Sequence, residues 1–98
     1  MTVINSAHAG TLESSDVYIQ INPIDEDMVE IELESSVEEL YGEMIEELIR
    51  DTLKNMKVSY VNVKVQDKGA MDLVIKARLQ SAILRACQMS RNPDWSVL

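Results

Sequence analysis

Two short segments near the start of the chain alternate apolar with polar residues. In residues 17–22 valine and isoleucine occupy every second position, and in residues 29–34 every second residue is a glutamate. A period of two predicts strands that bury one face and expose the other. Pro23 ends the first segment, and the link over residues 24–28 is short and rich in turn-forming acids. We therefore expect the two strands to form an antiparallel hairpin.

The next segment changes to helical spacing. Apolar residues recur three and four positions apart from Val37 to Met56, which is about five turns, while acidic residues fill most of the other side. Ser35 and Ser36 each stand three residues ahead of a glutamate, the pattern of a capping box at a helix start. The spacing predicts a helix that begins after these serines and buries its apolar side.

A third strand and a second helix complete the pattern. Valines alternate with polar residues within 58–66, which predicts another half-buried strand. The residues Asp-Lys-Gly that follow form a turn, and apolar residues at helical spacing then predict a helix over about 70–89. Asn92 and Pro93 mark the end of this helix.

The order of these elements predicts an α+β fold, a two-layer sandwich with ββαβα order. A three-stranded sheet would carry polar residues on one face and be covered by two helices on the other. The connection through the first helix favours pairing of the third strand beside the first, in the order 2-1-3, although pairing beside the second strand stays open.

The 98 residues are enough for one small domain with a single core. Residues 1–13 show no usable period and are expected to be a flexible N-terminal segment, followed by a folded core over 14–90 and a C-terminal tail over 91–98. The chain has neither a long apolar run nor the start of a signal peptide, and its single cysteine, Cys87, suits a reducing compartment. A cytoplasmic location is the simplest interpretation.

Charge is divided sharply along the chain. The net charge is −8, but residues 1–53 carry −13 and residues 54–98 carry +5. This asymmetry argues against duplex nucleic acid as a partner of the acidic half, because phosphates would repel it, and favours basic protein surfaces. The alternative is that these carboxylates are only the solvated faces of a hairpin and a helix.

Conventional catalytic groupings do not occur in the sequence. His8 is the only histidine, no cysteine lies near it, and no set of residues has the spacing of a metal site. The adjacent hydroxyls of Ser14 and Ser15 stand between Glu13 and Asp16, without a base that could activate either as a nucleophile. These residues suit either a point of covalent attachment or simply the start of a strand.

Three blocks of sequence, in the same order, resemble the acyl carrier protein of citrate lyase, the gamma subunit. The blocks are AGTLESSDV at residues 9–17, SSVEELYG at residues 35–42 and DKGAMDLVIKARL at residues 67–79, and a similar tail with Trp95 follows. Conventional acyl carrier proteins are also small and acidic. They are all-helical, however, and present their serine in a DSL motif, which this chain lacks.

The resemblance implies that Ser14, less readily Ser15, bears a covalently attached phosphoribosyl dephospho-coenzyme A group, because family members have Gly or Ser at the second position. The thiol of this group would carry acetyl and citryl thioesters between the alpha (transferase) and beta (lyase) subunits, while citrate is cleaved to acetate and oxaloacetate. The chain itself would be a non-catalytic subunit.

The resemblance also implies other partners: a prosthetic-group transferase, or holo-carrier synthase, and an acetate ligase that acts on the thiol. Neither nucleic acid nor a membrane is expected. The acidic half would be a docking surface, with Glu43, Glu46 and Glu47 as its candidate residues.

Two other interpretations stay open. The carrier subunit of malonate decarboxylase uses the same kind of prosthetic group. A small α+β sandwich with an open polar sheet face equally suits an unmodified regulatory or protein-docking module.

Overall fold

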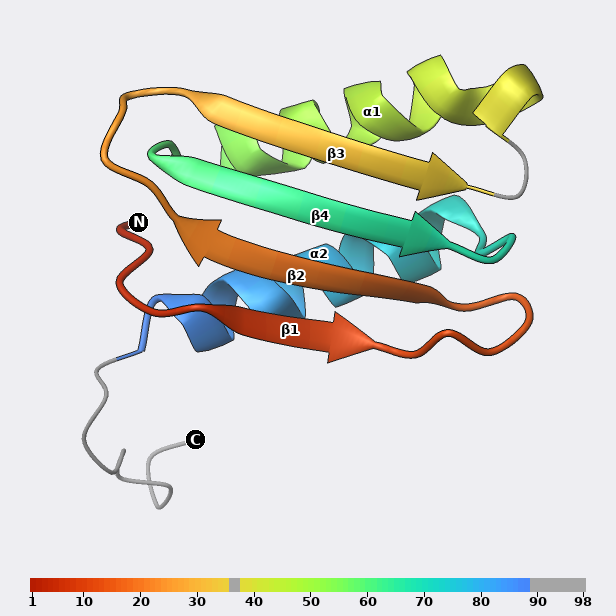
Figure 1. Ribbon diagram of the computed structural model, residues 1–98, viewed down its shortest axis with the longest axis horizontal. Coiled ribbons are helices and arrows are strands. Elements are labelled where there is room, and N and C mark those ends of the chain that lie inside the picture. The colour runs from red at the N-terminus through yellow and green to blue at the C-terminus, as the bar shows by residue number, and fades with distance from the viewer. Residues whose placement is uncertain (36–37, 89–98) are drawn as a thin grey trace.

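Four strands and two helices make up the described part of the computed structural model, residues 1–35 and 38–88 (Figure 1). The elements are β1 (Ala7–Gly10), β2 (Val17–Pro23), β3 (Val29–Ser35), α1 (Glu38–Asn55), β4 (Val61–Asp67) and α2 (Asp72–Ala86). The α+β class and the order of the predicted elements are confirmed, with bounds within a few residues of those expected. Neither helix in these ranges has the length and apolar character needed to cross a membrane.

The sheet order is β1-β2-β4-β3, so the predicted hairpin and the predicted order 2-1-3 are both wrong. The third predicted strand, β4, does pair with the first, β2, as expected, and it pairs with the second, β3, as well. β4 lies in the middle, antiparallel to β2 and parallel to β3, with Val63 opposite Ile21 on one side and Ile31 on the other. The alternation of residues defines which face a strand buries but not which strand lies beside it. The valine-rich β4 suits a central place. The glutamate row of β3 suits an edge, where charges discourage pairing with another chain.

Residues 1–13 are not a flexible tail, because they contain β1 and are anchored on both sides of it. β1 pairs antiparallel with β2 along its whole length. Upstream, the amides of Ile4 and Asn5 both donate to the carbonyl of Ala86 at 3.0 Å, and the side chain of Val3 is buried. The sheet therefore has four strands and not the three predicted, and the N-terminal segment reaches the end of α2.

The small residues of β1 explain why the sequence pattern did not reveal it. In the segment Ala-His-Ala-Gly only Ala9 is buried, with 2% of its surface exposed, so no alternation of large apolar and polar side chains appears. The position of β1 is decided by main-chain pairing with β2 and by packing against α2. Small side chains allow this close packing.

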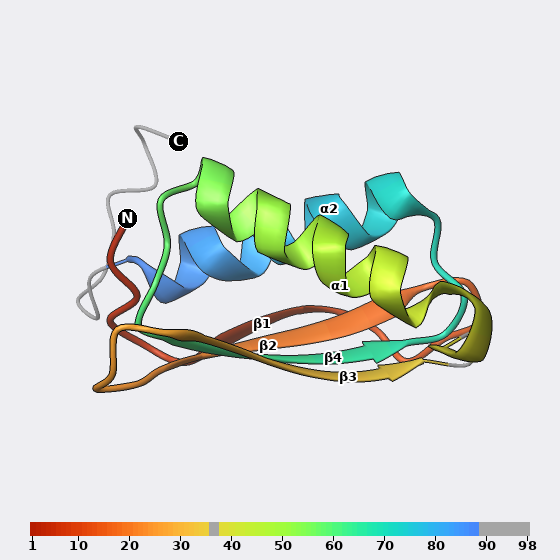
Figure 2. The ribbon, with the colours of Figure 1, turned by 90° about the horizontal axis from the view of Figure 1, so that it is seen from above.

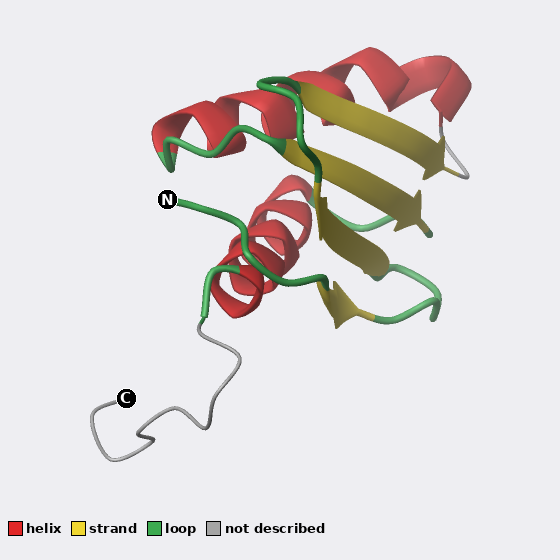
Figure 3. Cartoon of the chain, turned by 60° about the vertical axis from the view of Figure 1, so that its left-hand side comes forward, coloured by secondary structure: helices red, strands yellow, loops and turns green. Residues whose placement is uncertain are grey.

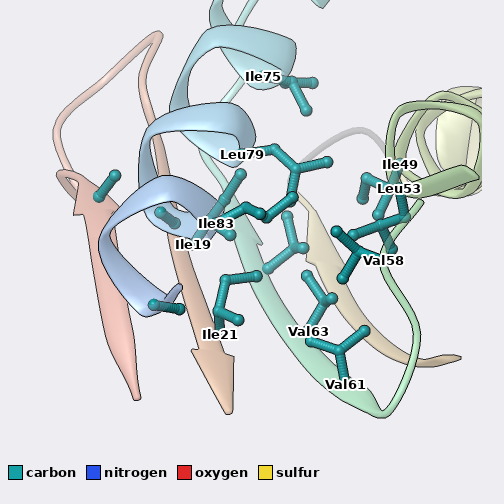
Figure 4. Packing of buried hydrophobic residues seen from close by; sticks show 14 of the residues in the cluster. Ile19, Ile21, Ile49, Leu53, Val58, Val61, Val63, Ile75, Leu79 and Ile83 are labelled. Carbon is teal, nitrogen blue, oxygen red and sulfur yellow. The ribbon is translucent and has the colours of Figure 1, made fainter. Parts of the chain in front are cut away.

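Both helices cover one face of the sheet, as predicted (Figure 2). α1 packs against β3, α2 packs against β1 and β2, and the helices also contact each other (Figure 3). The layer between the helices and the sheet is aliphatic (Figure 4). Its fully buried side chains include Ile19, Ile21, Ile49, Leu53, Val63, Ile75, Leu79 and Ile83. The outer face is polar, as predicted, with Asn62 donating to Glu32 at 2.8 Å across neighbouring strands.

Several predictions concern residues that lie outside the described part of the chain. These are the capping role of Ser36, the stop signal of Asn92 and Pro93, the tail over 91–98 and the match at Trp95. The second helix itself ends at Ala86, three residues before its predicted end near Met89. Ser35 is described, and its hydroxyl donates to the carboxylate of Asp67 at 2.8 Å.

Replacing Ala9 by aspartate tests the assignment of β1. The change places an unpartnered charge in a buried position, and we expect it to lower the free energy of unfolding by about 3 kcal/mol or more. Urea denaturation followed by circular dichroism measures this loss. His8→Asp is the matched control, because it adds the same charge to the same strand at an exposed side chain. We expect it to cost no more than about 1 kcal/mol. Small and equal losses of unfolding free energy in the two variants would contradict the assignment of β1 as a strand.

Candidate functional site

The predicted attachment serines lie in the turn between β1 and β2, at one end of the sheet (Figure 1). The amide of Asp16 donates to the carbonyl of Glu13 at 3.1 Å, which closes a β-turn with Ser14 and Ser15 at its centre. Ser15 has a φ of 65°, whereas the φ of Ser14 is negative, and these signs are those of a type II turn. Both serine side chains are exposed. We call residues 11–16 the serine turn.

Asp16 is the centre of a hydrogen-bond network that closes both ends of the serine turn. Its Oδ2 accepts from Thr11 Oγ1 at 2.7 Å, where the chain leaves β1. Its Oδ1 accepts from the amide of Val17 at 2.7 Å, where β2 begins. The hydroxyl of Thr11 also accepts from the amide of Glu13 at 3.2 Å. One carboxylate therefore joins the start and the end of the turn.

Arg78 of α2 holds the same carboxylate. Its Nε donates to Oδ1 of Asp16 at 3.2 Å and its Nη2 donates to Oδ2 at 3.1 Å, which makes a bidentate pair. Gly10 leaves room for this arrangement, with a φ of 91°. A Cβ at that position would clash with the carbonyl oxygen of Val17 and would lie 3.4 Å from Cδ of Arg78. A larger residue therefore does not fit unless β2 moves.

The turn after β4 supports the serine turn through the main chain. The amide of Ser15 donates to the carbonyl of Lys68 at 2.8 Å, and the amide of Lys68 donates to the carbonyl of Asp16 at 2.9 Å. These bonds extend the ladder between β2 and β4 beyond the strand ends. Asp67 in turn accepts from the amide of Ala70 at 2.9 Å. The serine turn is thus joined to α2 by side chains and to β4 by main chain.

The network makes Asp16 an unusually strong acid. Hydrogen bonds from the Thr11 hydroxyl, the Val17 amide and the Arg78 guanidinium, in decreasing order of effect, lower the pKa of Asp16 from 3.8 to about 2. A carboxylate with so low a pKa is a poor general base at neutral pH. The network therefore holds the turn in place and does not supply acid or base catalysis.

The acidic residues predicted for docking lie apart from the serine turn, on α1 at the β3 side of the sheet (Figure 1). Glu43 and Glu47 are exposed, and Glu46 is partly exposed and accepts from Arg50 at 3.5 Å. Glu43 and Glu46 line a hollow of about 400 Å³ together with Gly42 of α1 and two residues of β3. The structure therefore does not bring the predicted docking and attachment residues together.

His8 and Cys87 have ordinary structural surroundings. His8 is exposed on β1 with its ring 5.5 Å from that of Tyr18, so the expectation of a residue in a mobile tail is wrong. Cys87 follows α2 and is partly buried, and burial raises the pKa of its thiol. Among residues 1–35 and 38–88, no group of His, Cys, Asp and Glu is arranged to hold a metal ion.

Sequence reasoning identified the serines but not the residues that hold them. Asp16 appears in the sequence only as an acid beside the serines, and Arg78 lies 62 residues away from it. No local spacing connects such a pair. The one available signal is that Arg78 falls within the resembling block at 67–79, close to the turn residue Lys68.

Comparison with known proteins places these features in a family. The family model described as "Malonate decarboxylase delta subunit (MdcD)" matches residues 4–86. The citrate lyase acyl carrier protein of Vibrio cholerae is 43% identical over 98 residues, covering 100% of this chain and 99% of the relative. That of Lactobacillus acidophilus is 47% identical over 98 residues and 100% of both chains. Citrate lyase acyl carrier protein 2 of Salmonella typhimurium is 45% identical over the same full lengths.

A solved structure has the same fold. One chain in the crystal structure of a Pseudomonas malonate decarboxylase hetero-tetramer in complex with malonate matches with a TM-score of 0.72, at 16% identity, over 86% of each chain. The full-length relatives define the class as acyl carrier proteins, subunits that carry a group and do not catalyse its reaction. Within that class, the chain belongs to the family of citrate lyase acyl carrier proteins.

Acidification should release the serine turn only at very low pH. Because the pKa of Asp16 falls from 3.8 to about 2 on folding, its stabilising effect is complete above about pH 3.8 and is lost as the pH falls through about 2. An NMR titration of the Asp16 carboxyl carbon should show the low midpoint. In Arg78→Ala the midpoint should rise only part of the way, because Thr11 and Val17 still donate. A wild-type midpoint at the ordinary value would contradict the network.

Proposed function

We propose that the hydroxyl of Ser14 bears a phosphoribosyl dephospho-coenzyme A group in phosphodiester linkage, and that the chain thereby carries acyl groups within a citrate lyase. Membership in the citrate lyase acyl carrier family supports the role. The observation that carries the choice of residue is the place of Ser14 at an exposed corner of a turn that is held on both sides.

Local geometry favours Ser14 over Ser15 as the attachment residue. In the described part of the chain, no hydrogen bond engages the Ser14 hydroxyl, so it is accessible to a modifying enzyme. Ser15 shapes the turn instead: its φ of 65° lies in the region that glycine favours, and its amide is bonded to Lys68. This conformation accounts for the acceptability of Gly or Ser at the second position.

The surroundings of Ser14 suit a phosphodiester. Arg78 is partly exposed and directs two of its five N–H groups at Asp16, which leaves further donors. Lys68 is exposed, and its main chain is bonded to the serine turn. Arg78 already balances the charge of Asp16, so Lys68 on the neighbouring turn is the cation that we propose opposes the charge of the diester. When attached, the group supplies a thiol to which acyl groups are bound.

The residues of the chain act by anchoring. Thr11, Asp16 and Arg78 hold the base of the arm, so motion is confined to the arm beyond Ser14. A tether keeps the acyl group at high effective concentration near more than one active site, because the group cannot diffuse away between steps. Bond making and breaking would then belong to the partner subunits.

We infer that the alpha (transferase) and beta (lyase) subunits share the arm, and that a prosthetic-group transferase (holo-carrier synthase) and an acetate ligase act on it before turnover. The names of the full-length relatives support a place in citrate lyase. The chain of similar fold belongs to a hetero-tetramer, which supports a subunit role. We place the protein in the cytoplasm, in accord with its one unpaired cysteine, Cys87.

A second candidate is the carrier subunit of malonate decarboxylase. The description of the matching family model and the shared fold favour it. Sequence identity favours citrate lyase, since full-length relatives reach 43% and 47% whereas the chain of the malonate decarboxylase structure reaches 16%. Both candidates require a modified serine, whereas an unmodified docking module does not.

The mass of the intact protein tests the attachment. After expression together with the enzymes that make and attach the prosthetic group, the wild-type chain should gain the mass of one dephospho-coenzyme A derivative, and fragmentation should place it on Ser14. Ser14→Ala should abolish the gain completely. Ser15→Gly is the matched control and should keep it, because glycine accepts the φ of 65° without strain. An unmodified wild-type chain, or a gain retained in Ser14→Ala, would refute the proposal.

We also propose the acidic side of α1, formed by Glu43, Glu46 and Glu47, as a docking surface for a basic partner subunit. The charge of −13 over residues 1–53 supports it. The exposure of Glu43 and Glu47, the partial exposure of Glu46 and the hollow beside Glu43 and Glu46 also support it.

Reversing these charges tests the docking surface. Glu43→Lys, Glu46→Lys and Glu47→Lys combined should raise the dissociation constant for the partner subunits by about tenfold or more at low salt, with a smaller effect at high salt. Surface plasmon resonance at two ionic strengths measures both. The same reversal at Asp25, Glu26 and Asp27, exposed in the loop between β2 and β3, is the charge-matched control. Equal weakening in both variants would point to net charge alone.

A further inference from the structure

We infer that Asp16 and Arg78 are positioning residues that hold the serine turn in the one conformation recognised by the enzyme that attaches the prosthetic group. The inference rests on the proposed attachment at Ser14 and extends it, because it makes the conformation of the turn, and not the serine alone, the recognised feature. Residues of β1, the turn itself and α2 contribute to that conformation, together with the main chain of Lys68 after β4.

The serine turn has little apolar burial to stabilise it. Leu12, Glu13, Ser14 and Ser15 are all exposed. A segment that buries so little surface gains its order mainly from hydrogen bonds, and otherwise samples many conformations. The side-chain bonds centred on Asp16, together with the main-chain bonds to Lys68, therefore determine what fraction of molecules holds the turn in this conformation.

The pair between Asp16 and Arg78 is suited to this role by its geometry and burial. Both carboxylate oxygens are engaged, at 3.2 and 3.1 Å, so the orientation of the carboxylate is defined and not only its distance. The side chain of Asp16 is 15% exposed, which shields it from solvent more than an ordinary surface ion pair. The same oxygens accept from Thr11 and Val17, so the orientation set by Arg78 is passed to both ends of the turn.

Gly10 shows that the arrangement is sterically specific. A Cβ there would overlap the carbonyl group of Val17, while it would only touch the stem of Arg78 at 3.4 Å. The glycine at the end of β1 thus lets the chain pass close to the start of β2, where Thr11 donates to Asp16 across the turn. For an enzyme that binds only the ordered turn, the apparent affinity is the intrinsic affinity multiplied by the fraction of molecules in which the turn is ordered.

Steady-state kinetics of the attaching enzyme, with the unmodified full-length chain as the varied substrate, test the inference. In Arg78→Ala we expect KM to rise about tenfold with a smaller change in kcat, because the recognised conformation becomes the minor one. The KM of Arg78→Lys should lie between those of the wild type and Arg78→Ala, since an ammonium cannot make both bonds of the guanidinium. Thr11→Val removes a different donor from the same carboxylate and should raise KM about threefold.

Arg85→Ala is the matched control. Arg85 lies on the same helix and also ties it to β1, through its Nη1 and the carbonyl of His8 at 2.7 Å, but it does not touch the serine turn. We expect its KM to stay within about twofold of wild type. The double variant Asp16→Asn with Arg78→Ala should be little worse than either single variant, because both remove the same interaction.

Amide hydrogen exchange gives a readout independent of attachment. Arg78→Ala should lose protection at Ser15 and Asp16 while the core strands keep theirs. Loss of protection with an unchanged KM would overturn the inference, as would equal rises in KM for Arg78→Ala and Arg85→Ala. If the wild-type chain itself accepts no group, the proposed attachment fails instead, so the two failures are distinct.

Discussion

The central position of β4 is the constraint on which the rest of the structure depends. β4 is the last strand in the sequence, yet it lies between β2 and β3 and pairs with both. Its valines, Val61, Val63 and Val65, are buried in the core, and β2 and β3 both pair with β4 and not with each other. The same ladder continues past the strand ends to Lys68, which bonds to Ser15 and Asp16. The strand that completes the core therefore also locates the serine turn.

The segments that resemble the citrate lyase carrier family meet at this end of the sheet. The first block supplies Gly10, Thr11 and Asp16, the third supplies the Lys68 turn and Arg78, and Ser35 at the start of the second donates to Asp67. Residues distant in sequence thus build one support for a turn with an exposed hydroxyl. A carrier needs this combination, because the arm must move while its base stays in a recognisable place.

The spacing of apolar residues along the sequence predicted most of the secondary structure. β2, β3, β4 and both helices lie near their predicted residues, since alternation and helical spacing are imposed by burial of one face. β1 did not follow, because Ala9 is its only buried residue and its identity as a strand rests on main-chain bonds to β2. At the site, Ser14 and Ser15 were marked by their sequence block, whereas the acid and the arginine that hold them were not marked by any spacing.

The sequence by itself determined which faces are buried, where the helices and the larger strands lie, and which serines are candidates for attachment, because each of these is encoded within a few neighbouring residues. Only the tertiary structure decided the neighbours of each strand, the role of the N-terminal residues and the pairing of Asp16 with Arg78. Strand pairing and an ion pair across 62 residues depend on how distant segments pack. Shape and hydrogen bonding in the folded chain determine which strands and which side chains pair, and no local pattern in the sequence predicts these pairs.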